Sequence, residues 1–125
     1  MAQTIRLFLL VEAASFIVAA LIHMGFFVTG YEHARARIAE SVIAGVLFGG
    51  LLLTLFIPAW KRNVALVVQV FALFGTLVGV FTIIVGVGPR TIPDVLYHIA
   101  IAVVLAAGIA VAKSAPVPSG DEVGP

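Results

Sequence analysis

Three histidines are the residues in this sequence best suited to chemistry, and all three lie toward one end of its long apolar segments. His23 and His98 are each expected roughly 9 to 10 Å inside the same membrane surface, at about 1.5 Å of rise per residue. Two imidazoles at equal depth on adjacent helices could hold a planar iron porphyrin between them. We therefore expect a haem b site ligated by two histidines. His33, about 4 Å shallower, could replace either ligand. Copper, zinc or a lone iron remain alternatives.

Other polar residues near the histidines could complete such a site. Arg37 and Arg90 could bind the haem propionates through forked hydrogen bonds, and Tyr97 stands beside His98 in the sequence. Asp94 lies one helical turn before His98, so its carboxylate could orient that imidazole.

These residues also have a purely structural interpretation. His23 and His98 could be interhelical hydrogen-bonding residues, because polar side chains often bridge membrane helices. Glu32 and Asp94 could be helix caps, and the arginines could be surface anchors.

A second polar group is expected in the other half of the membrane. Glu12 lies eleven residues before His23, which is three helical turns, so both side chains should face into the bundle. Gln69 and Thr54 are expected in the same half. Glu12 could be a proton relay or a proton-coupled substrate site, or a protonated carboxyl hydrogen bonded to Gln69.

The elements that carry these residues follow from the apolar runs. The chain has 125 residues, of which 62% are hydrophobic and 10% charged, so the bilayer is its expected solvent. The runs predict an all-α membrane domain at 1–112 with four transmembrane helices, at 7–28, 34–57, 64–87 and 92–112. The first run is too long for a signal peptide, so we expect it to be retained. Residues 113–125 are rich in Pro, Ser and Gly, which predicts a disordered tail.

Short loops between the runs predict an up-down-up-down four-helix bundle. Two segments, Thr29 to Glu32 and Thr91 to Asp94, fit the Thr-x-x-acid capping box and should begin the second and fourth helices. Pairs and runs of small residues predict close helix packing or a homodimer interface. They are Gly45 with Gly49, Gly75 with Gly79, and Ala102, Ala106, Ala107, Gly108 and Ala110.

Charge and composition exclude several classes. A net charge of +1, with few charged residues, excludes a disordered chain and a basic nucleic-acid-binding face. The absence of cysteine excludes disulfides, iron–sulfur clusters and covalent haem attachment through Cys. Four Lys and Arg residues on the side of the termini, against three on the other side, predict a multi-pass protein of the cell membrane with cytoplasmic termini.

The chain resembles a group of small, mostly uncharacterised bacterial four-helix membrane proteins. The resemblance is carried by GVGPRTIPDVLYH (86–98), LIHMG around His23 and GYEHARARIAE (30–40). The placement of the histidines is similar to that in membrane b-type cytochromes, which implies redox or electron transfer, or haem handling, with a redox partner or a quinone. In its length, its four helices and Glu12 the chain also resembles small multidrug resistance transporters, which implies proton-coupled transport. A structural or assembly subunit is the remaining alternative.

Overall fold

The computed structural model describes residues 1–117 and 119 and is all-helical over that part of the chain. Four long helices, joined by short connections, make up the fold, which confirms the predicted fold class. They are α1 (Ala2–His23), α2 (Ala34–Phe56), α3 (Lys61–Val85) and α4 (Ile92–Ser114), with a short 3₁₀ helix η1 (Pro58–Trp60) between α2 and α3. The predicted tail begins inside α4, and residues 118 and 120–125 lie outside the described residues.

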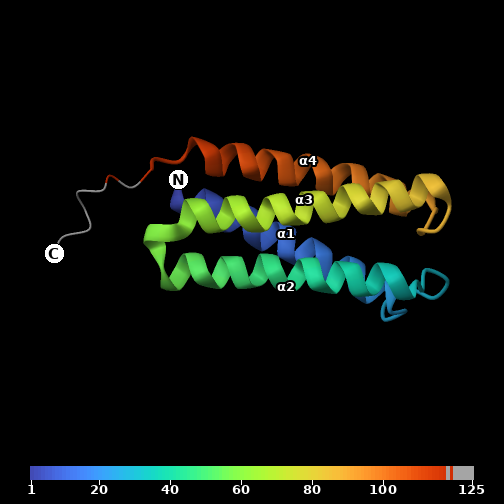
Figure 1. Ribbon diagram of the computed structural model, residues 1–125. Helices are drawn as coiled ribbons and strands as arrows, with labels where there is room; N and C mark the ends of the chain where they lie inside the picture. The colour runs from blue at the N-terminus through green and yellow to red at the C-terminus, as the bar shows by residue number, and fades with distance from the viewer. Residues whose placement is uncertain (118, 120–125) are drawn as a thin grey trace.

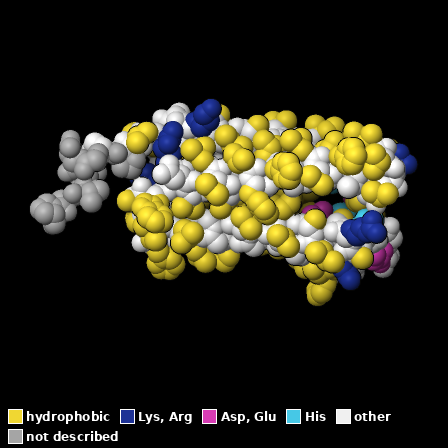
Figure 2. Space-filling view, viewed as in Figure 1, with side chains coloured by type: hydrophobic (Ala, Val, Ile, Leu, Met, Phe, Trp, Pro, Cys, Tyr) yellow, Lys and Arg dark blue, Asp and Glu magenta, His cyan; other side chains and the backbone are white. Residues whose placement is uncertain are grey.

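The helices run up and down in sequence, so the start of α1 and the end of α4 lie at the same end of the bundle (Figure 1). Helix α1 packs against α2 and α4, and α3 packs against the same two helices. All four are long and apolar enough to cross a membrane. Hydrophobic side chains cover the middle of the bundle, and charged side chains gather toward its two ends (Figure 2). Which end faces the cytoplasm stays a prediction.

Helix α1 begins and ends about five residues earlier than its apolar run predicts. It starts at Ala2 and stops at His23, because Gly25 adopts a left-handed conformation with φ of 80°. The backbone N–H of His33 then donates to the free carbonyl of His23 over 3.0 Å, which closes the loop back onto the helix end. His23 is therefore at the end of α1 and not a turn and a half inside it.

Only one of the two predicted capping boxes is present. At Thr91, the side chain accepts from the backbone N–H of Asp94, and the Asp94 carboxylate accepts from the backbone N–H of Thr91. The box predicted at Thr29 is wrong, because α2 begins five residues later. Its N-cap is His33, whose Nδ1 accepts from the backbone N–H of Ala36 over 3.1 Å. Glu32 instead accepts from the backbone N–H of Gly30.

Small residues serve different purposes on different helices. A Cβ added at Gly75 would lie 2.8 Å from the Ile43 side chain, so this glycine permits close packing of α3 on α2. Gly45 and Gly49 have open space where a Cβ would be, so this pair faces away from the bundle. The predicted homodimer stays a prediction, and these two glycines leave space on α2 for the close approach of another helix.

The polar layer predicted around Glu12 is present. Gln69 Nε2 donates to both carboxyl oxygens of Glu12, over 3.0 and 3.1 Å, and both side chains are fully buried. A Cβ at Gly108 would overlap Gln69 Nε2, so the glycine makes room for the pair. The hydrogen-bonded interpretation of Glu12 is confirmed in its geometry, and a role in proton-coupled transport stays a prediction.

The Thr91 cap leads to a stability prediction. Thr91→Val keeps the shape of the side chain and removes the hydroxyl that begins α4. We expect the free energy of unfolding in detergent to fall by about 1 kcal/mol. Ser41→Ala is the control, because the exposed Ser41 hydroxyl only donates to a carbonyl of its own helix. A Thr91→Val protein as stable as the control would show that the cap does not hold the helix start.

Candidate functional site

His23 lies between two carboxylates that come from two other helices. Its Nδ1 is 2.7 Å from Glu40 Oε2, and its Nε2 is 3.0 Å from Asp94 Oδ1. All three residues are buried, with exposed fractions of 3%, 5% and 7%. A cluster of this kind joins the end of α1 to α2 and α4.

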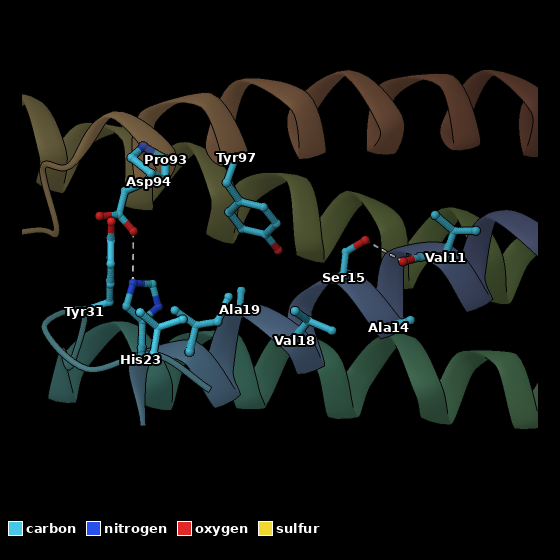
Figure 3. Close-up of a pocket in the computed structure, with 12 residues that line it drawn as sticks. Val11, Ala14, Ser15, Val18, Ala19, His23, Tyr31, Pro93, Asp94 and Tyr97 are labelled. Atoms are coloured by element: carbon cyan, nitrogen blue, oxygen red, sulfur yellow. Dashed lines mark hydrogen bonds and ion pairs between the residues drawn. The ribbon is translucent and has the colours of Figure 1, made fainter. Parts of the chain in front are cut away.

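Each side chain is placed by the local structure of its helix. His23 is the last residue of α1, on the buried stripe that also carries Phe16 and Ala19. Glu40 is the first buried residue of α2 and lies on the same buried face as Ile43. Asp94 lies in the first turn of α4, where one carboxylate oxygen caps the helix and the other faces His23 (Figure 3).

The two hydrogen bonds of His23 account for two of the protons of the cluster. Each of the two contacts of His23 joins a nitrogen to a carboxylate oxygen, so each requires one proton between the two atoms. With no further proton on Glu40 Oε1 or Asp94 Oδ2, two protons shared by one imidazole ring and two carboxylates leave a net charge of −1, whichever atoms carry them. In the described part of the chain, the ion pairs of Glu40 and Asp94 are both with His23. The cluster therefore carries one uncompensated negative charge.

A groove of about 730 Å³ runs between α1 and α4 and ends at this cluster. Of the four pairs of neighbouring helices, α1 and α4 pack least closely, which leaves this space. The α1 side is formed by small and apolar residues and one serine: Val11, Ala14, Ser15, Val18, Ala19 and Ile22. Val11 and Val18 are nearly half exposed, so the groove opens to the surroundings of the bundle.

Two tyrosines line the groove near its polar end. Tyr97 projects from α4 toward α1 (Figure 3), and its ring contacts Phe16 edge-on at 6.1 Å between centroids. Its hydroxyl oxygen is buried and has no hydrogen-bond partner among the described residues. Tyr31, from the loop between α1 and α2, lines the same end. A buried hydroxyl without a partner is destabilising, and because this oxygen is covered, the ring of Tyr97 is the part that lines the groove.

A second, smaller cavity of about 180 Å³ lies on the other side of the cluster, between α2, α3 and α4. It is lined by Glu40, Arg35, His33 and His98, among others. His98 Nδ1 donates to the backbone oxygen of Asp94 over 2.7 Å, which leaves Nε2 with a lone pair when the ring is neutral. Unlike the groove, this cavity contains an arginine.

The structure separates the residues predicted to act together. His23 lines the groove and His98 lines the second cavity, with its Nε2 2.8 Å from where a Cβ of Gly79 would lie. The Asp94 carboxylate faces His23, so the prediction that it orients His98 is wrong; only its backbone oxygen does so. His33 lies near His23, with ring centroids 6.3 Å apart, but caps α2.

The remaining predicted residues lie outside the cluster. Arg37 is exposed on α2, and Arg90 lies in the loop before α4 with its guanidinium near Gly86. Glu40 was not predicted to contact His23. Its signal in the sequence was its spacing from Ile43 and Leu47, which puts a carboxylate on the inward face of a membrane helix.

The contacts observed do not suit a haem held by paired histidines. Both nitrogens of His23 are bonded to carboxylates, and His98 packs against α3, so each side chain would have to leave its contacts to reach an iron. Within residues 1–117 and 119, no group of three or more His, Asp or Glu side chains is arranged to hold a metal ion. The two carboxylates lie on different nitrogens of the same ring, so they do not converge on one point.

Comparison with protein families, curated proteins and solved structures finds no match to this chain. The fold and the site define it as a bundle of four membrane-length helices with a buried acid–histidine–acid cluster at one end. An apolar groove leads to that cluster from the side of the bundle.

The cluster predicts a large effect of removing the imidazole. His23→Ala leaves Glu40 and Asp94 buried without their partner, so we expect the free energy of unfolding to fall by about 3 to 5 kcal/mol. Arg37→Ala, at an exposed position of α2, should change it by less than about 0.5 kcal/mol. Denaturation of both variants in the same detergent measures the difference. Equal stability of the two variants would contradict a cluster that depends on His23.

Proposed function

We propose that this protein is a membrane protein that binds an amphipathic small molecule in the groove between α1 and α4. The apolar part of the molecule lies along α1, and its polar head meets His23 and Asp94, beside the rings of Tyr31 and Tyr97. The observation that carries the proposal is a long apolar groove that ends at a buried acid–histidine–acid cluster.

The length and lining of the groove suit a hydrocarbon chain. Val11 and His23 are twelve residues apart on one helix, which corresponds to about 18 Å. Between them the α1 wall presents Ala14, Val18 and other small or apolar side chains. Val11 and Val18 are nearly half exposed at the outer surface of the bundle, so a molecule dissolved in the bilayer can enter from the side.

The polar end of the groove supplies hydrogen bonds to a head group. Asp94, His23 and Tyr31 line this end. In a setting of low dielectric such contacts are stronger than in water. A ligand in the groove can therefore be held at its head by polar contacts and along its chain by apolar ones.

Photolabelling tests the proposal. Three probes share a ten-carbon chain with a diazirine and differ only in the head, which is an amine, a hydroxyl or a carboxyl. In phosphatidylcholine nanodiscs, we expect at least one probe to label the α1 and α4 segments of the groove, detected by mass spectrometry. Labelling of the lipid-facing side of α3, at Val67 and Phe74, measures background exposure to the probe.

A matched pair of variants identifies the groove as the site. Ala14→Phe fills the groove at an exposed position and should reduce groove labelling several-fold. Ala107→Phe places the same ring at an exposed position of α4 that does not line the groove, and should leave labelling unchanged. If no probe labels the groove above its level in Ala14→Phe, the proposed function is wrong.

Haem binding, expected from the sequence, is the alternative that absorbance spectra test. The three imidazoles lie at the same end of the bundle, but His23 would have to leave both of its hydrogen bonds, and Nε2 of His98 lies against Gly79 of α3. A sharp Soret band of the purified protein that is lost in His23→Ala and His98→Ala, but kept in Lys61→Ala, would establish haem ligation. An unchanged spectrum in both histidine variants would rule out these ligands.

A further inference from the structure

We infer that the head group bound in this groove is a cation, namely the protonated amine of a lipophilic molecule. The inference rests on the proposed function and adds the class of ligand. It follows from three features of the polar end of the groove: its charge, the absence of a basic counter-charge in its lining, and its tyrosines.

The charge of the cluster is negative in every arrangement of its two protons. His23 bonded to Glu40 and to Asp94 carries a net charge of −1, and Asp94 lies at the wall of the groove. A buried charge is expensive unless an opposite charge lies close by. An ammonium in the groove beside Asp94 brings the local charge to zero, whereas a carboxylate brings it to −2.

The charged groups around the cluster leave this position open for a cation. The residues that line the groove include no lysine and no arginine. Arg35 on α2 and the imidazoles of His33 and His98 line the second cavity, on the far side of Glu40. Helix α3 contributes no titratable residue to the lining of either cavity. The basic groups therefore lie across the cluster from the groove.

The tyrosines supply the remaining contacts that an ammonium needs. The ring of Tyr97 lines the groove, while its hydroxyl is buried and turned away from Asp94 (Figure 3). The rings of Tyr97 and Tyr31 line the same end of the groove, and aromatic faces attract cations. A carboxylate and two aromatic rings are together the chemistry of an ammonium site.

The three photoreactive probes distinguish this inference from the proposed function. In nanodiscs of zwitterionic phosphatidylcholine, with labelling normalised to α3, we expect the amine probe to label the groove about tenfold more than the hydroxyl probe, as a charge-assisted hydrogen bond predicts. The carboxyl probe should label least. Equal or stronger labelling by the hydroxyl or carboxyl probe would overturn the cation and leave the proposed function standing. Labelling by none of the three would remove both.

A substitution outside the groove tests whether charge is the cause. Glu40→Gln keeps an oxygen that accepts from His23 Nδ1, does not alter the groove lining, and changes the net charge of the cluster from −1 to 0. We expect the amine probe to lose most of its advantage over the hydroxyl probe. Retention of the full tenfold preference in Glu40→Gln would overturn the inference. Loss of the wild-type preference in Ala107→Phe, whose substituted residue does not line the groove, would also overturn it.

Discussion

The contact of one imidazole with two carboxylates is the interaction on which the polar end of this bundle depends. His23, Glu40 and Asp94 come from three helices, and each is buried where water cannot replace a lost partner. Lipid tails are as apolar as leucine, so apolar contact alone gives membrane helices little reason to choose one pairing over another. A buried acid–histidine–acid cluster gives them one, because any other rotation or depth leaves a charge unpaired.

The groove is a consequence of the same arrangement. Helix α1 packs closely on α2, while its contact with α4 is looser and includes the polar contact between His23 and Asp94. Small side chains such as Ala14 and Ala19 do not fill the space that remains. The result is an apolar groove whose polar end is formed by His23 and Asp94. Tyr97, whose ring is packed and whose hydroxyl is not bonded, stands where these two environments meet.

The sequence by itself determined the features that depend on local patterns. Apolar runs of membrane length predicted four helices, and short connections predicted their antiparallel order, because neither depends on how the helices are rotated. Glu12 was expected to face inward, and a hydrogen bond to Gln69 was one of its two interpretations; the structure has both the inward position and the bond. Helical periodicity fixes which face a residue occupies, and only a few polar groups lay at that depth. The Thr91 cap was predictable because it is a local contact, made within four residues of the sequence.

Only the tertiary structure decided which polar residues meet. The partners of His23 lie 17 and 71 positions away, so their pairing depends on where each helix stops and how it is turned. A left-handed Gly25 ends α1 five residues before its apolar run ends, which moves His23 to the helix end and level with Asp94 instead of His98. Apolarity sets the length of a hydrophobic run, but backbone conformation sets the helix end. The sequence suggested that His23 and His98 pair, which requires the two imidazoles to lie at equal depth. In the structure His23 instead lies level with Asp94, one helical turn before His98, and it pairs with the carboxylates of Asp94 and Glu40.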